Sequence, residues 1–428
     1  MATETTLSDV FPLGSRVNER GRLEIGGCDT IELAREFGTP AYVVAEDDLR
    51  ARARAFVQAG AATGYRDFNV VFASKAFPCT AVLALFAHEG LWCDVASGGE
   101  LHLALNAGFP AERLVLHGNA KSESELRTAL ELGVGLIVLD NFNEIDRLER
   151  LLARGDSGGA DAQVLIRVTP DVRGETHEKI STGQADSKFG FSIARAAEAI
   201  ARVQQAGGLK LEGLHAHIGS QLLELDPFRA EIAELAKLGD FPVWDLGGGL
   251  GVRYTAEQPS PPPVEEYVQT IAQAAAEHGM DAPGKRLFIE PGRSLCANAG
   301  VTLYGVESVK QNVSRWVAVD GGMSDNLRPM LYGAVYEAHV ADRLGGEMPC
   351  ELAGKHCESG DVIVREALLD DPRVGDVVVT PATGAYGYAM ANNYNGVPRA
   401  PVIFCRDGDA RAVVRRETFD DLIARDVR

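Results

Sequence analysis

Residues 68–96, FNVVFASKAFPCTAVLALFAHEGLWCDVA, contain the unit from which the fold is predicted. The stretch begins with an apolar run, Phe68–Ser74, and ends with a second one, Leu91–Ala96. Both runs are continuously apolar rather than alternating, which is typical of parallel strands buried on both faces. Between them, Thr80–Glu89 has the composition and length of a helix. The stretch therefore predicts a strand–helix–strand unit of a parallel sheet.

The same pattern continues as far as Glu290. Six more strands are predicted at 114–117, 136–140, 164–168, 211–218, 243–246 and 287–290. Helices are predicted at 47–60 before the first strand, and then at 100–107, 123–131, 143–152, 193–205, 227–238 and 267–278. Eight strand–helix units over ~220 residues have the period of a closed barrel. An open doubly wound sheet is the alternative, but eight units would be many for it. We predict an α/β protein built on a (β/α)8 TIM-type barrel.

A second domain is predicted after Gly292, where short β runs lie between Gly, Asp and Pro turns. The runs are 301–310, 315–319, 362–366, 377–380, 401–405 and 412–416. Two early runs, Arg22–Gly26 and Ala41–Ala45, have no place in the barrel count, so we assign them to this all-β domain. The prediction is a barrel at 46–300 and a β-barrel or sandwich domain made of 1–45 and 301–428.

Charge and cysteine content narrow the class of protein. The 428 residues carry 42 Lys plus Arg against 61 Asp plus Glu, a net charge of −19, which argues against nucleic acid and anionic lipid as partners. No apolar run approaches the ~20 residues of a membrane span, and residues 1–11 lack the pattern of a signal peptide. The seven cysteines are scattered without a C-x-x-C pair, so we expect neither disulfides nor structural zinc, and a cytoplasmic protein.

Reactive residues follow several predicted strands at the ends where such barrels carry their chemistry. Lys75 follows the first strand, Gly247–Gly249 close the seventh, and Glu290 and Arg293 follow the eighth. A glycine cluster at such a point is suited to binding a phosphate through backbone N–H groups. A lysine for a Schiff base, a phosphate cradle and a buried carboxylate are what pyridoxal phosphate requires.

His215 and His217 allow another interpretation. They are two residues apart on a predicted strand and therefore face the same side. Such a pair binds metal in some barrel hydrolases, or is simply a buried core pair. The sequence shows no further His or Asp cluster of suitable spacing, so no metal site is predicted.

The motifs that carry a family resemblance run in order from about Gly21 to Gly396. They are Ala73–Phe77, Ser97–Leu101, His117–Asn119, Ser187–Gly190, His215–Gln221, Asp245–Gly249, Glu290–Arg293, Cys357–Asp361 and Gly384–Tyr386. In this order and spacing the chain resembles the alanine-racemase-like, barrel-type pyridoxal-phosphate decarboxylases. Within them it is most similar to the branch that converts meso-2,6-diaminopimelate to L-lysine and CO2.

The resemblance implies a role for each matching residue. Lys75 would bind the aldehyde, His217 would stack on the ring, and Glu290 would pair with the ring nitrogen. The phosphate would be held by Ser220, Gly247, Gly248, Gly249, Gly292, Arg293 and Tyr386. The substrate, a small amino acid, would be contacted by Arg293, Arg328, Tyr332, Glu358 and Tyr386.

Cys357 would come from the second subunit of a homodimer that shares its active sites, and would protonate the substrate carbon; Lys75 is the rival donor. The family often has Gly-Pro-x-Cys where this chain has Gly354-Lys355-His356-Cys357. We expect Lys355 or His356 to lower the pKa of the thiol.

Substrate choice is predicted from two side chains. Arg328 can bind the distal carboxylate of diaminopimelate with two hydrogen bonds, and Glu358 can take its ammonium. The alternatives are a decarboxylase of another basic or carrier-bound amino acid, a non-catalytic homologue that regulates an active enzyme, and a metal-dependent barrel hydrolase. Retention of Lys75, Glu290 and Cys357 argues against the non-catalytic homologue.

Overall fold

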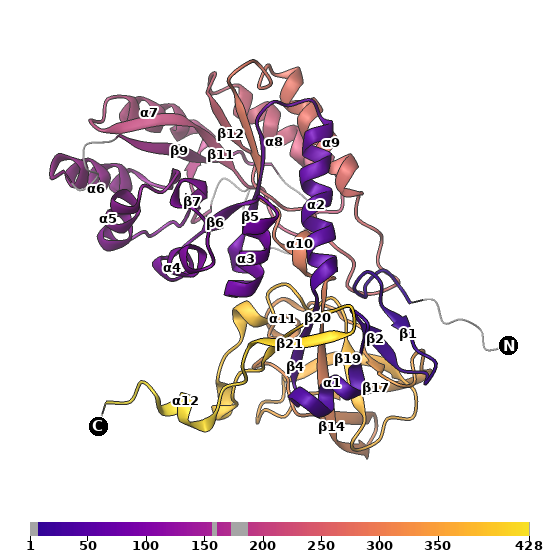
Figure 1. Ribbon diagram of the computed structural model, residues 1–428. Helices are drawn as coiled ribbons and strands as arrows, with labels where there is room; N and C mark the ends of the chain where they lie inside the picture. The colour runs from indigo at the N-terminus through magenta and orange to yellow at the C-terminus, as the bar shows by residue number, and fades with distance from the viewer. Residues whose placement is uncertain (1–6, 156–160, 173–186, 428) are drawn as a thin grey trace. The chain divides into compact units, whose positions relative to one another are not determined.

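A computed structural model describes residues 7–155, 161–172 and 187–427 (Figure 1). Residues 1–6, on which the expected lack of a signal peptide partly rests, lie outside the described residues. The chain divides into two compact units. One unit comprises 52–251 and 261–293, and is called here the barrel unit. The other comprises 1–51, 252–260 and 294–428, and is called the β unit.

Within the described part of the barrel unit, eight parallel strands close into a barrel, because β8 pairs with β9 and β13 pairs with β5 (Figure 1). The strands are β5 (Phe68–Ala73), β6 (Trp92–Val95), β7 (Leu114–Leu116), β8 (Leu136–Leu139), β9 (Ala162–Thr169), β11 (Leu209–Ala216), β12 (Val243–Asp245) and β13 (Arg286–Ile289). A two-residue strand, β10 (Phe191–Ser192), extends β9. The predicted TIM-type barrel is confirmed, and the open sheet is wrong.

One helix precedes the first barrel strand and the others follow later strands, in the order that the sequence predicts. They are α2 (Glu46–Ala62), α3 (Thr80–His88), α4 (Gly98–Asn106), α5 (Glu123–Leu132), α6 (Phe142–Ala153), α7 (Ile193–Gln204), α8 (Asp226–Ala236) and α9 (Val264–Glu277). Buried side chains of several strands, among them Val71, Val115, Leu165 and Phe288, form a hydrophobic cluster in the barrel unit. The barrel is therefore a packed core, and its chemistry lies at the strand ends.

The β unit contains a large mixed sheet and a three-stranded sheet. The first joins β4 (Ala41–Ala45), β14 (Gly300–Gln311), β15 (Arg315–Val319), β16 (His339–Val340), β17 (Met348–Ala353), β18 (Val362–Leu369), β19 (Val377–Thr380), β20 (Val402–Arg406) and β21 (Asp409–Val414). The second joins β1 (Arg16–Val17), β2 (Leu23–Ile25) and β3 (Cys28–Asp29). Because β4 pairs with β14 and β20, the N-terminal strands belong to this unit, as predicted.

Four α-helices and five strands among the described residues are absent from the sequence-based prediction. The helices are α1 (Thr30–Phe37), α10 (Arg293–Cys296), α11 (Arg328–Tyr332) and α12 (Phe419–Ile423). The strands are β1, β3, β10, β16 and β17. β17 carries Pro349 and its side chains alternate between buried and partly exposed, so it does not read as an apolar run. Its hydrogen bonds to β15 and β18 make it a strand, although its composition does not predict one.

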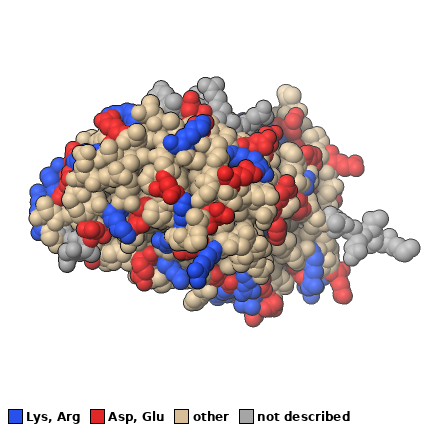
Figure 2. Space-filling model, turned by 90° about the horizontal axis from the view of Figure 1, so that it is seen from above, with Lys and Arg blue, Asp and Glu red and all other residues tan. Residues whose placement is uncertain are grey.

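The molecular surface carries acidic and basic side chains interspersed with one another on the face seen in Figure 2. In the described part of the chain, no helix combines the length and the apolar character that crossing a bilayer requires.

Candidate functional site

Glu290 lies at the carboxyl end of β13, between two histidines. Its Oε1 is 2.7 Å from His117 Nε2, and its Oε2 is 3.2 Å from His215 Nε2. The two imidazole rings meet edge to face, with centroids 4.8 Å apart. Because a carboxylate can only accept, both Nε2 atoms donate to it. The sequence named these histidines within motifs but gave neither of them a role toward Glu290.

The charge on Glu290 is fixed by these contacts. Burial by itself would raise the pKa of its carboxyl, but His117 and His215 hold that pKa well below its usual range. Burial lowers the pKa of His215 to about 3, so this ring is neutral near pH 7. Glu290 is therefore a buried anion that accepts N–H groups and keeps free lone pairs for another donor.

Two further carboxyls lie near Glu290. Burial and the neighbouring Glu290 raise the pKa of Asp245 well above its usual range, which favours its neutral form. Burial raises the pKa of Asp94 to about 6, against the attraction of His117 and Lys75. The pKa values of these two carboxyls are thus shifted in the opposite direction to that of Glu290.

A glycine cradle follows β12. Gly247 and Gly249 have positive φ angles of 59° and 137°. A Cβ on Gly248 would lie 2.0 Å from the carbonyl oxygen of Glu290, so only glycine fits there. Ser220 and Arg293 contact each other in the same unit, with Arg293 Nη2 donating to Ser220 Oγ at 2.9 Å. A hydroxyl and a guanidinium beside a glycine-rich turn are groups that bind a phosphate. In this chain the backbone N–H of Gly247 donates to Asp245 Oδ1 at 3.1 Å.

His217 and Lys75 occupy the ends of β11 and β5. The backbone N–H of Gly248 donates to His217 Nδ1 at 3.2 Å. Burial, together with the positive charges of Lys75 and Arg167, lowers the pKa of His217 well below its usual range. This imidazole is therefore neutral, which suits a flat contact with an aromatic ring. Lys75 lies in a 3₁₀ turn, Ser74–Ala76, directly after β5, and its side chain is exposed.

Arg328 in the β unit is a buried guanidinium held by aromatic rings. It lies 4.6 Å from the ring centroid of Tyr254 and 5.5 Å from that of Tyr336, and it donates to the Tyr336 hydroxyl. The sequence predicted Arg328 as a site residue but neither tyrosine. Tyr254 is distant from Arg328 in the chain, and Tyr336 does not belong to any of the motifs quoted above. Tyr332 ends the same helix, α11, and is half-buried. Tyr386, also half-buried, has a positive φ of 62°.

Cys357 and Glu358 lie in the loop between β17 and β18, and both are exposed. The Cys357 backbone N–H donates to Asn395 Oδ1 at 2.8 Å. His356 is buried, and its Nδ1 lies 2.7 Å from Asp361 Oδ2. The imidazole of His356 thus takes Asp361 as its partner, and an effect of His356 on the Cys357 thiol stays a prediction. Lys355 is exposed beside it.

The structure corrects one expectation about metal ligands. Ligand atoms of His117, His215, Asp245 and Glu290 all lie within 4.8 Å of one another, a cluster that the sequence spacing did not reveal. Two features oppose metal binding: both Nε2 atoms donate to Glu290, and burial raises the pKa of Asp245, which favours its neutral form. The cluster is better suited to binding a group that brings its own N–H.

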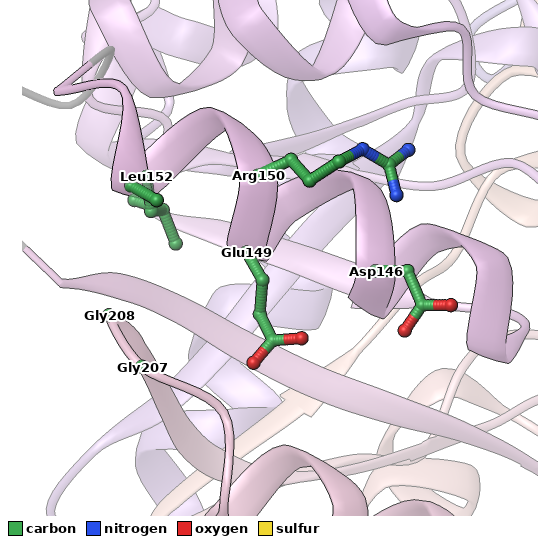
Figure 3. Close-up of a pocket in the computed structure, with 7 residues that line it drawn as sticks. Asp146, Glu149, Arg150, Leu152, Gly207 and Gly208 are labelled. Carbon is green, nitrogen blue, oxygen red and sulfur yellow. The ribbon is translucent and has the colours of Figure 1, made fainter.

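A surface pocket of about 630 Å³ lies at the other end of the barrel strands (Figure 3). It is lined by Asp146, Glu149, Arg150, Leu152, Ala153, Gly207 and Gly208. Gly207 and Gly208 precede the first residue of β11, whereas His217 and Ser220 follow its last residue. This pocket is therefore separate from the strand ends that carry the predicted site.

The barrel unit fits pyridoxal phosphate in three ways that depend on its own residues. The glycine cradle with Ser220 and Arg293 supplies phosphate donors. Neutral His217 supplies a flat face, and anionic Glu290 supplies an acceptor for a protonated ring nitrogen. Lys75, at the end of β5, supplies the amine.

Comparison with known proteins agrees with this fit. Residues 46–297 match the family described as pyridoxal-dependent decarboxylase, pyridoxal binding domain. The chain is 46% identical to the diaminopimelate decarboxylase of Bacillus subtilis, covering 96% of this chain and 97% of that protein. It is equally identical to that of Actinosynnema pretiosum, over 100% and 96%.

A solved structure extends the similarity to three dimensions. The diaminopimelate decarboxylase of M. jannaschii, in complex with L-lysine, superposes with a TM-score of 0.90 at 33% identity, over 96% of this chain and 97% of that one. The chain therefore belongs to the diaminopimelate decarboxylase family of pyridoxal-dependent decarboxylases.

Proposed function

We propose that this protein removes the carboxyl group from the D-configured centre of meso-2,6-diaminopimelate, with pyridoxal 5'-phosphate as its cofactor, and releases L-lysine and CO2. The observation that carries the proposal is the Glu290 carboxylate, held as an anion by two imidazole N–H donors beside a phosphate cradle. L-Lysine is the molecule bound to the M. jannaschii relative.

Pyridoxal phosphate, when bound, supplies an electron-withdrawing ring that accepts the electron pair of the broken Cα–carboxylate bond. Glu290 would keep the ring nitrogen protonated, because a buried anion stabilises a facing cation. Lys75 would hold the aldehyde until the substrate amine replaces it. His217 would cover one face of the ring.

The phosphate would be bound by the glycine cradle and its neighbours. We assign it to Ser220, Gly247, Gly248, Gly249, Gly292, Arg293 and Tyr386. The cradle is built of glycines at positions where a Cβ would clash, and the Arg293–Ser220 contact orients both side chains beforehand. Preorganised donors of this kind lower the entropy cost of binding.

Arg328 would bind the distal carboxylate of the substrate, and Glu358 its distal ammonium, with Arg293, Tyr332 and Tyr386 as further contacts. The guanidinium of Arg328 is already desolvated against Tyr254 and Tyr336. A buried guanidinium pairs strongly with a carboxylate and leaves an uncompensated charge when the ligand lacks one. This favours diaminopimelate over ornithine, arginine or another basic amino acid.

Cys357 would return a proton to the substrate carbon after CO2 leaves, with Lys75 as the rival donor. Because Cys357 and Glu358 are exposed on this chain, we propose that both act in a homodimer whose active sites are shared between subunits. We further propose that the cofactor domain spans 46–300 and the β domain 1–45 with 301–428. The described cysteines form no disulfide bonds with one another, which supports a cytoplasmic location.

A turnover comparison tests the proposal. Purified protein loaded with the cofactor is supplied in parallel with meso-diaminopimelate, ornithine, arginine and lysine, and CO2 release is measured. We expect release from diaminopimelate alone at a substantial rate. A preference for ornithine or arginine would reject the substrate assignment, and release from none of the four would reject this decarboxylase function.

A further inference from the structure

Lys121 is a buried cation in the loop that follows His117, and the proposed reaction does not use it. Its ammonium donates to the carbonyl oxygens of Gly118 and Val138, each at 2.7 Å, and to Glu144 Oε1 at 2.8 Å. The side chains of Lys121 and Glu144 are only 2% and 0% exposed. All three N–H groups of the ammonium thus have a partner within the barrel unit.

Glu144 ties the same loop to the start of α6. Its Oε2 accepts the backbone N–H of Asp140 at 2.8 Å. The neighbouring Asn141 accepts the Glu144 N–H at 3.1 Å and donates to the carbonyl oxygen of Asn119 at 3.2 Å. The loop 117–121 is therefore held through Gly118, Asn119 and Lys121 to the end of β8 and the first turn of α6.

The position of this loop determines where His117 lies. His117 immediately precedes Gly118, which has a φ of +120° and whose carbonyl oxygen Lys121 binds. His117 Nε2 in turn lies 2.7 Å from Glu290 Oε1. A displacement of ~1 Å in a group that orients a catalytic side chain is enough to reduce the rate by about a hundredfold.

Stability alone does not account for the pair. Burial lowers the pKa of Lys121 and raises that of Glu144, so each charge depends on the other. Apolar residues of similar volume often replace a buried ion pair without loss of stability. What apolar side chains cannot replace is the hydrogen bond from Lys121 to the Gly118 carbonyl oxygen.

We propose that Lys121 and Glu144 form a positioning pair, which fixes the loop 117–121 so that His117 Nε2 reaches Glu290. The inference rests on the proposed function, because Glu290 affects turnover only if it faces the cofactor. The contact between His117 and Glu290 can nevertheless be observed without turnover.

The test compares Lys121→Met with the double variant Lys121→Met/Glu144→Leu. The single variant leaves Glu144 buried without its partner, whereas the double variant removes both charges. Val203→Ala, which truncates a core side chain in α7, is the control for loss of stability alone. Val203 is fully buried, and it takes no part in the hydrogen bonds that hold the loop 117–121. The thermal midpoint, kcat and KM are measured for each.

A second readout is independent of activity. The full chain without cofactor is labelled with ¹⁵N-histidine, and the His117 ring signals are assigned by their loss in His117→Gln. We expect both Lys121 variants to shift these signals and to lower kcat by about 10- to 100-fold with little change in KM. The double variant should regain most of the thermal stability but not the kcat.

Two results would overturn the positioning role. One is a double variant whose His117 signals and kcat equal those of the wild type. The other is a Val203→Ala variant whose His117 signals and kcat change as much as those of the Lys121 variants. The double variant decides the matter if Lys121→Met fails to fold. If the wild-type protein releases no CO2 from diaminopimelate, the proposed function fails, while the His117 signals still report on the loop.

Discussion

The proposed site residues of the barrel unit and those of the β unit differ in their burial and in the hydrogen-bond partners that they have within this chain. Glu290, His117 and His215 are buried, and both histidines are hydrogen-bonded to Glu290. Cys357 and Glu358 are exposed, and Cys357 is anchored through its backbone N–H. The barrel unit thus builds its part of the site from its own strands, whereas the β-unit loop presents side chains outward.

Arg328 lies between these extremes. It is buried in the β unit, but its guanidinium faces aromatic rings and a phenol rather than a carboxylate. A buried cation without an anion is costly unless a ligand supplies the charge. The difference indicates that the cofactor end finds its partners within this chain, which is why we propose that substrate and a second subunit complete the substrate end.

The largest expected effect comes from the barrel unit. Lys75→Ala should reduce diaminopimelate turnover by about 10⁴-fold or more, because the variant loses both the amine that holds the aldehyde and a candidate proton donor. Its bound cofactor should also lose the visible absorbance of the lysine adduct. CO2 release and absorption spectra check both, with the exposed Lys237→Ala as the control. Turnover near the wild-type rate in Lys75→Ala would reject the mechanism.

Cys357 tests whether the β-unit loop acts across subunits. Cys357→Ala should lower kcat by about 10²-fold, the smaller value expected for loss of a positioned acid. Mixing and refolding it with Lys75→Ala should restore about a quarter of wild-type activity, because half of the dimers are hybrids with one intact site. Cys350→Ala, a buried cysteine of the same unit, should give full activity by itself. No recovery in the mixture would contradict the shared site.

Replacing Arg328 tests how the β unit recognises the distal carboxylate of the substrate. Arg328→Ala should lower kcat/KM for diaminopimelate by about 10- to 100-fold, since one charge-assisted interaction with the distal carboxylate is lost. The exposed Arg365→Ala should change nothing. Steady-state kinetics on diaminopimelate and lysine measure the change in preference. An unchanged kcat/KM for diaminopimelate in Arg328→Ala would remove the basis for the substrate assignment.

The smallest effect concerns stability and pH. The pKa of His215 is lowered from 6.5 to about 3. The unfolded chain therefore takes up a proton at this residue below pH 6.5, while the folded chain does not do so until about pH 3. Its contribution to the free energy of unfolding is complete above pH 6.5 and falls as the pH drops, by at most about 1.4 kcal/mol per pH unit.

His215→Gln keeps an N–H donor for Glu290 but removes the titration. The difference in unfolding free energy between wild type and His215→Gln should change by about 2 kcal/mol between pH 7 and pH 5, with the wild type losing more. Urea denaturation at both pH values measures it. His278→Gln, at an exposed histidine, should give a constant difference. A constant difference for His215→Gln as well would show that His215 is not held neutral.

The sequence by itself determined the barrel. Each of the eight apolar runs is a strand, with ends that differ by two residues or fewer from the prediction, because parallel strands buried on both faces must be continuously apolar. It also indicated the strand-end residues Lys75, His217, Glu290 and Arg293 by their position after those runs. These roles remain predictions, as do those of Arg328, Cys357 and Glu358.

Only the tertiary structure decided which residues meet. His117 and His215 are 173 and 75 positions from Glu290 in the chain, and closure of the barrel brings all three together. Tyr254 and Tyr336 meet Arg328 in the same way. The charge states followed from this packing, because burial and neighbouring groups shift a pKa, and neither is written in local sequence.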